Sequence, residues 1–174
     1  MSLVPDDKDW TWVLERQCDE CEFDASVTAT ADVAQMTRDA SAQWVELLTT
    51  RVDVTTRPRL DVWSPLEYGC HVRDVYRVYT KRLRRMLNED GPHYENWDQD
   101  KTAVEDRYSE QDPVAVAVDI RDEGTTLANL FDSIEGEQWE RAGFRSDGAA
   151  FTIDTISRYF VHDVVHHLHD VGAP

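Results

Sequence analysis

The chain has 174 residues, of which 41% are hydrophobic, and this length and composition suit one globular domain. Its 18 basic and 35 acidic residues give a net charge of −17, which argues against nucleic-acid phosphates or an anionic membrane surface as partners. No apolar run approaches the roughly 20 residues of a membrane helix, and the first residues do not resemble a signal peptide. We therefore expect a cytoplasmic protein with no nucleic-acid or membrane partner.

The chain begins with an arm, residues 1–25, whose tryptophans and aliphatic residues predict that it packs onto a body spanning residues 26–174. Cys18 and Cys21 in this arm have the CxxC spacing of half a zinc knuckle. A closed zinc site needs four ligands, however, and the sequence has no second CxxC. With Cys70 the cysteine count is odd, which does not suggest a disulfide framework. We expect the pair not to form an obligatory zinc site.

Four long segments predict helices, because apolar residues recur in them at spacings of three and four. The second segment has the clearest start, since Ser64 and Glu67 form a capping box with Pro65 at the first helical position. The third starts with the capping pair Asp112-Pro113. The predicted helices are Ala31–Leu48, Ser64–Leu87, Pro113–Ile134 and Thr152–Val171.

A connection of about 24 residues, Asn88 to Gln111, joins the second and third helices. It is too long for a tight turn, and a capping-box match at Thr102 predicts a short helix within it. Strand signals are sparse: only the stretch from Val52 to Val62 has some β character, and no sheet of three strands is expected. The fold class is therefore all-α, a four-helix bundle with a long crossover between helices 2 and 3.

The predicted last helix carries a dense histidine cluster, and residues four apart share a helix face. Two pairs could therefore hold one metal ion: Asp163 with His167, or His162 with His166. At about 100° per residue, Asp163 and His167 lie beside the apolar stripe, whereas His162 points nearly opposite. We favour the first pair and keep the second as the alternative register.

A third ligand should come from a facing helix, where His71 is the one histidine of the second helix and shares a face with inward-type residues. Glu67, one turn earlier, could hold the other ring nitrogen of His71. Three N/O ligands leave an open coordination position, as in catalytic zinc sites. The alternative is that both histidines are simply buried and hydrogen-bonded.

Two segments carry a family resemblance: Trp63-Ser64-Pro65-Leu66-Glu67-Tyr68-Gly69-Cys70-His71, and the downstream run Asp163-x-x-His166-His167-x-x-Asp170-Val171. They resemble the DinB-like superfamily over about residues 26 to 172, and more narrowly the mycothiol-dependent maleylpyruvate isomerase N-terminal domain branch. The resemblance implies a four-helix bundle with a divalent metal, zinc or nickel. The ligands would be one histidine of the second helix and two residues of the last. His71 and His167 match, and Asp163 stands where the isomerase branch has a carboxylate.

The resemblance further implies a thiol S-transferase or a thiol-dependent isomerase. A GC-rich coding bias, inferred from arginine outnumbering lysine, favours mycothiol as the thiol and possible co-substrate, with a small electrophile as second substrate. Tyr159, one turn before Asp163, is a candidate proton donor or substrate contact, although it could serve only in packing. The alternatives are a non-enzymatic metal- or ligand-binding stress protein, possibly a homodimer, and a water-activating metallohydrolase, for which the sequence offers no clear general base.

Overall fold

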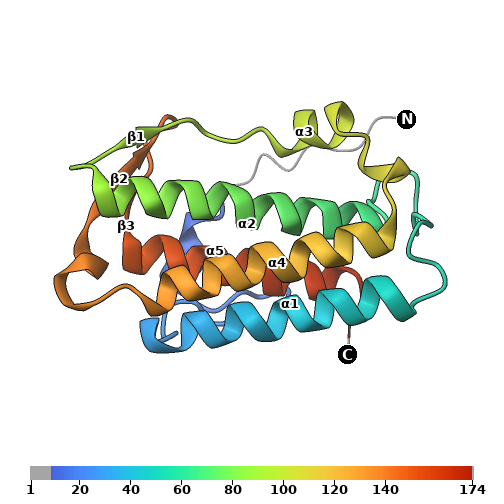
Figure 1. Ribbon diagram of the computed structural model, residues 1–174, viewed down its shortest axis with the longest axis horizontal. Coiled ribbons are helices and arrows are strands. Elements are labelled where there is room, and N and C mark those ends of the chain that lie inside the picture. The colour runs from blue at the N-terminus through green and yellow to red at the C-terminus, as the bar shows by residue number, and fades with distance from the viewer. Residues whose placement is uncertain (1–8, 174) are drawn as a thin grey trace.

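Three of the four long helices begin at a side chain that accepts a hydrogen bond from the backbone three residues on: Ser64, Asp112 and Thr152. The computed structural model describes residues 9–173 (Figure 1). The sequence predicted each long helix to within two residues at either end. These helices are α1 (Val33–Thr50), α2 (Pro65–Asn88), α4 (Pro113–Asp132) and α5 (Ile153–Asp170).

The apolar stripes of these four helices meet in one core, which confirms the predicted four-helix bundle. Helix α4 lies against α1 and α2, and α5 contacts the same two helices from the other side. In Figure 1, α2 and α4 run in the same direction, from right to left. The chain must therefore return the length of the bundle between them, which explains the long crossover.

The crossover runs along the outer side of α2 (Figure 1). It contains β1 (His93–Tyr94), α3 (Gln99–Glu105) and the 3-10 turn η3 (Tyr108–Glu110). The short helix predicted here exists, but it begins earlier than Thr102, because Asp98 accepts the capping hydrogen bond from Lys101. Arg82 and Arg85 of α2 donate to backbone carbonyls of Glu95 and His93. These arginines therefore hold the crossover against its helix.

A small sheet closes one end of the bundle, and the expectation of no three-stranded sheet was wrong in this detail. Strand β2 (Ala142–Arg145) pairs with β3 (Ala150–Thr152) antiparallel and with β1 parallel. These strands have two to four residues, too few for an alternating pattern to stand out. The stretch from Val52 to Val62, which showed some β character, forms turns instead of a strand.

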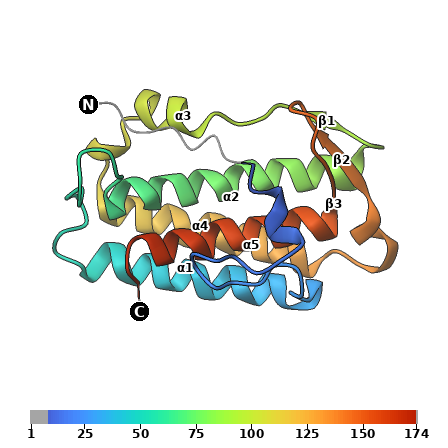
Figure 2. The same cartoon turned by 180° about the vertical axis from the view of Figure 1, so that it is seen from behind.

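The described part of the arm lies on α5, on the side shown in Figure 2. The arm contains the 3-10 helix η1 (Thr11–Leu14). Two further 3-10 helices lie outside the arm: η2 (Thr30–Asp32) leads into α1, and η4 (Gly136–Glu140) precedes β2. Residues 1–8 of the expected arm lie outside the described residues. Among the described helices, none combines the length and apolarity needed to cross a membrane.

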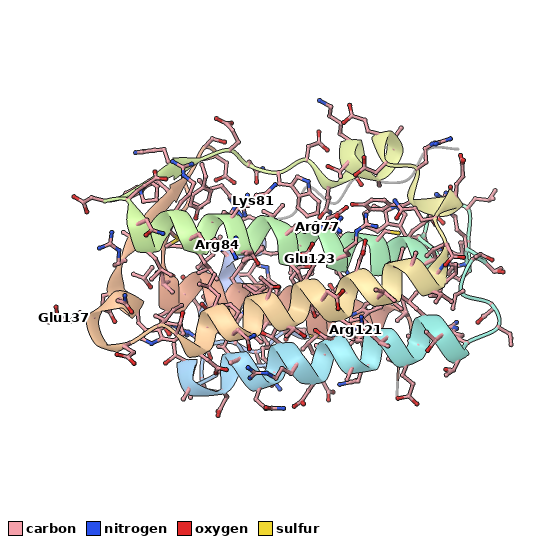
Figure 3. All side chains as sticks on the ribbon, in the orientation of Figure 1. Arg77, Lys81, Arg84, Arg121, Glu123 and Glu137 are labelled. Atoms are coloured by element: carbon pink, nitrogen blue, oxygen red, sulfur yellow. The ribbon has the colours of Figure 1, made fainter. Side chains whose placement is uncertain are left out.

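Charged side chains bridge α2 and α4 on the side facing the viewer in Figure 3. Arg77 donates to Glu123 at 2.8 Å and to Asp119 at 3.0 Å. Deeper in, Arg73 pairs with Asp74 at 3.0 Å, and both side chains are buried. The Tyr108 hydroxyl donates to Asp74 at 2.6 Å, so the end of the crossover is tied to the same carboxylate.

We expect Gly124→Ala to destabilise the bundle, because Gly124 is the point of close approach between α4 and α1. A Cβ there would stand 2.1 Å from Ser41 Oγ and 3.0 Å from Tyr76 Cε2. The cost should be about 1–3 kcal/mol, typical of overpacking, in a denaturant-unfolding measurement. Removing the nearer obstacle in the double variant Ser41→Ala/Gly124→Ala should recover part of the loss. A single variant as stable as the natural chain would contradict this packing.

We also expect Asp74→Asn to lower stability at pH 7 by about 3 kcal/mol, because it leaves Arg73 buried with too little negative charge. Burial would raise the pKa of Asp74, but Arg73 and Tyr108 hold it below the ordinary 3.8. A lowered folded-state pKa gives stability that is present above 3.8 and is lost as the pH falls through the folded value. The difference between the natural chain and the variant should therefore shrink in unfolding measurements at strongly acidic pH.

Candidate metal centre

Asp163 on α5 lies between two histidines from different helices. Its Oδ1 is 3.0 Å from His167 Nε2 on the same helix and 3.6 Å from His71 Nε2 on α2. One donor atom from each of the three residues lies within 4.8 Å of the others. Ligands held by one ion at about 2.1 Å in a tetrahedral arrangement are about 3.4 Å apart. The spacing of these donors therefore fits a single first-row metal ion.

A hydrogen bond at Nδ1, the nitrogen that faces away from Asp163, orients the His167 ring. Nδ1 of His167 lies 2.9 Å from Asp170 Oδ2, one turn further along α5. Burial disfavours the charged ring, but the hydrogen bonds to Asp163 and Asp170 outweigh it and raise the pKa of His167 to about 9. A carboxylate on the far nitrogen of a metal-binding histidine is a common support, because it fixes the ring and the tautomer.

His71 and Asp163 have the charge states that a metal requires. His71 is only 1% exposed, and burial lowers its pKa despite the nearby Asp163. Burial would raise the pKa of Asp163, but hydrogen bonds from His167 and His71 keep it far below its usual range. A neutral imidazole and an ionised carboxylate are both competent ligands. The Nδ1 of His71 is buried without a hydrogen-bond partner among the described residues, and Trp97 stacks on the ring at 5.3 Å.

The expectation that Glu67 holds His71 is wrong. Both oxygens of Glu67 are engaged elsewhere: it accepts hydrogen bonds from Arg57 and, through the capping box, from the backbone N–H of Ser64 at 2.8 Å. The cap directs this carboxylate toward the start of α2. Its role here is to begin the helix that carries His71.

A cavity of about 1140 Å³ opens beside the cluster, and both Asp163 and His167 line it. Tyr159 lines the same cavity, as the sequence-based role required, and burial raises the pKa of its hydroxyl. The Arg145 guanidinium lies 5.9 Å from the centre of the Tyr159 ring. Arg145, Arg82 and Tyr79 of the cavity wall were not among the predicted site residues; they come from β2 and from buried positions on α2, where the sequence shows no motif.

The alternative register, His162 and His166, lies elsewhere. These two histidines contact the arm: His166 Nδ1 is 3.7 Å from Cys18 Sγ, and Trp10 packs tilted against the His162 ring and edge-on against the His166 ring. One donor atom each from Cys18, Cys21, His162 and His166 lies within 4.8 Å of the others. The last helix therefore places two further candidate donors beside the CxxC pair, which the sequence analysis did not expect.

The family model of the DinB superfamily matches residues 34–171. The chain belongs to the DinB superfamily. This match covers the four long helices except Val33, the first residue of α1. It includes both pairs of candidate ligands on α5 and leaves the described arm outside the DinB region. None of the curated proteins matches the chain in sequence.

A solved structure similar to this DinB-superfamily chain is YfiT from Bacillus subtilis, described as a probable metal-dependent hydrolase with an unusual four-helix bundle topology. The TM-score is 0.72 at 16% sequence identity, and the match covers 80% of this chain and 82% of the YfiT chain. At this identity the likeness shows the fold, which is the bundle with its long crossover.

We expect Asp170→Asn to lower the pKa of His167 in chelator-treated protein, because the variant removes one of the two anions that stabilise the imidazolium. The pKa should fall from about 9 toward the ordinary 6.5. A histidine NMR titration measures this directly. Asp154→Asn, on the first turn of the same helix, is the matched control and should leave the pKa of His167 unchanged. An unaltered pKa in Asp170→Asn would contradict the orientation described here.

Proposed function

We propose that this protein is a metal-dependent thiol S-transferase or thiol-dependent isomerase, with the ion held by His71, Asp163 and His167. The observation that carries the proposal is the convergence of two imidazole nitrogens and one carboxylate beside a large cavity. Three protein ligands leave a position open, which is the arrangement of catalytic sites. Membership of the DinB superfamily supports the same reading.

A divalent ion, zinc or nickel, would supply a Lewis acid at this position that holds an incoming thiol as its thiolate. The chain itself does the positioning. Asp170 fixes the ring of His167, and Trp97 stacks on His71, so the ligands are held before substrate arrives. Tyr159 stands one turn from Asp163 on the cavity wall, where its neutral hydroxyl can donate a proton or a hydrogen bond to the second substrate.

The cavity wall favours mycothiol over glutathione as the thiol. It includes carboxylates from the arm, the connection between α1 and α2, the crossover and the turn between β2 and β3: Asp9, Asp61, Asp98, Asp100 and Asp147. Carboxylates accept hydrogen bonds from sugar and inositol hydroxyls, which mycothiol offers, and they repel the carboxylates of glutathione. The volume of about 1140 Å³ exceeds the common range for a single small ligand, so a thiol and a small electrophile fit together.

Two other functions use the same cluster. A metallohydrolase would activate water in place of a thiol, and the fold shared with YfiT, described as a probable metal-dependent hydrolase, favours this second candidate. A non-enzymatic metal-binding stress protein would hold the ion and turn over nothing. The thiol requirement separates the three.

We expect metal-loaded protein to consume mycothiol in the presence of a soluble electrophile such as a bimane, measured as loss of free thiol. His71→Ala and His167→Ala should each abolish this turnover, because two remaining ligands hold a first-row ion poorly. Tyr159→Phe should lower turnover while keeping the metal. The matched control is His93→Ala on β1, which lies outside the cluster and should change neither.

The contrary outcomes are distinct. Hydrolysis of an activated ester without thiol, lost in His71→Ala, would replace the transferase with the hydrolase. Metal binding without turnover of either substrate would leave only the binding protein. Failure of the natural chain to retain zinc, nickel or cobalt at a site sensitive to His71→Ala would remove all three.

A further inference from the structure

We propose that Cys18, Cys21, His162 and His166 form a second metal centre, a closed zinc site that joins the N-terminal arm to α5. It is separate from the cluster around Asp163 and independent of the function proposed above. Its ligands come from two segments far apart in the sequence, a CxxC in the arm and an HxxxH on the last helix. Two thiolates and two imidazoles are a common donor set of structural zinc.

The geometry of the four residues fits one ion. Their donor atoms lie within 4.8 Å of one another, and Cys18 Sγ is 3.7 Å from His166 Nδ1. Sulfur and nitrogen ligands at about 2.3 and 2.0 Å in a tetrahedron are about 3.5 Å apart. The observed separation is that of a thiol–imidazole hydrogen bond, and it also matches the spacing of two ligands of one zinc ion.

The arm turns sharply to bring both thiols to this place. The N–H of Glu22 donates to the carbonyl of Cys18 at 3.0 Å, and the N–H of Cys18 donates to the carbonyl of Phe23 at 2.9 Å. Glu22 has a φ of 61°, a left-handed conformation that is uncommon for residues other than glycine. An uncommon backbone conformation persists only where the surrounding structure constrains it. A metal bound to Cys21, which precedes Glu22, and to Cys18 would supply that constraint.

His162 supplies an independent sign of a missing partner. The side chain is 3% exposed, although the helix-face argument pointed it away from the bundle core; Trp10 and Phe23 of the arm cover it. Its Nε2 is buried without a hydrogen-bond partner among the described residues. An unpaired buried nitrogen is costly, and a metal bond would satisfy it.

The remaining nitrogen of His166 is placed as a zinc ligand requires. With Nδ1 facing Cys18, Nε2 faces two carboxylates, Glu20 and Asp170, each at 3.6 Å. Glu20 stands between the two cysteines in the sequence, so the loop that delivers the thiols also delivers a carboxylate to the histidine. Carboxylates commonly hold the second nitrogen of zinc-binding histidines.

The donor chemistry selects zinc among the abundant ions. Thiolates disfavour magnesium and calcium, and four protein donors leave no position for substrate. On binding, each S–H bond is replaced by a Zn–S bond, two protons leave to solvent, and the charges of two thiolates and Zn²⁺ cancel.

Such a centre would have a structural consequence for the cavity. Trp10, Thr11 and Leu14 of the arm line the cavity, and His162 and His166 line it from α5. Zinc bound between these two segments would fix one wall of the cavity and keep the arm closed over α5. Its loss should release the arm while leaving the bundle, whose core is made by the long helices, intact.

The test uses the full chain purified under reducing conditions without chelator, with metal content measured by elemental analysis. We expect about two metal ions per chain, falling to about one in Cys18→Ser/Cys21→Ser and to about one in His71→Ala. Cobalt substitution distinguishes the two losses, because only the proposed zinc centre contains thiolate. The sulfur-to-cobalt charge-transfer band should be present in the natural chain and in His71→Ala and absent in the double cysteine variant.

Cys70→Ser is the matched control, since Cys70 is buried against the Tyr108 carbonyl and distant from the cluster in its contacts; it should keep the band. His162→Gln provides a second variant should the double cysteine variant fail to fold, and it should also lose about one ion. A natural chain with no thiolate band, a double cysteine variant that keeps the band, or a band lost in Cys70→Ser would each overturn the proposal. An unchanged ion count in His71→Ala would instead contradict only the catalytic centre.

Discussion

The site depends on the rotation of about 100° between successive residues of α5. His162 and Asp163 are adjacent, as are His166 and His167, so the two i, i+4 pairs point in directions about 100° apart. Asp163 and His167 therefore meet His71 of α2, and His162 and His166 meet the arm. About one and a half turns of α5 therefore contact both α2 and the arm. Any shift of α5 along its axis would break both clusters together, which couples the position of the arm to that of the bundle.

Asp170 lies beside both clusters without being a member of either. Its carboxylate lies 2.9 Å from His167 Nδ1 and 3.6 Å from His166 Nε2. It therefore fixes the ring of His167 by a hydrogen bond and lies within ion-pair distance of His166, and the opposite nitrogen of each ring faces its own cluster. The chain has a strong negative charge, and at this place its carboxylates lie next to imidazoles. Such an arrangement of carboxylates and imidazoles attracts metal cations.

The long helices and the fold class could be predicted from the sequence, because capping at Ser64 and apolar periodicity are local signals. The placement of His71 beside Asp163 and His167 followed from helix faces, although whether they bind metal stays a prediction. The predicted contact between Glu67 and His71 was wrong because it rested only on their i, i+4 spacing. The capping box, which the sequence also showed, already engages the Glu67 carboxylate. The short strands carried no periodic signal, and the cavity residues Arg145 and Arg82 depend on how the sheet and crossover fold back.

The partners of the cysteines could not be counted from a local pattern, because Cys18 and His166 are 148 residues apart. The HxxxH of α5 and the CxxC of the arm could each be recognised in the sequence. The choice between the two ligand registers, however, assumed that α5 has only one buried face. The arm creates a second buried face, and His162, which points away from the apolar stripe, is buried there. Each register therefore has further candidate donors beside it, from α2 in one case and from the arm in the other. An arm rich in aromatic residues must cover some part of the protein surface to bury its rings. A polar residue on the outer face of a helix can therefore be buried beneath a terminal segment, as His162 is here.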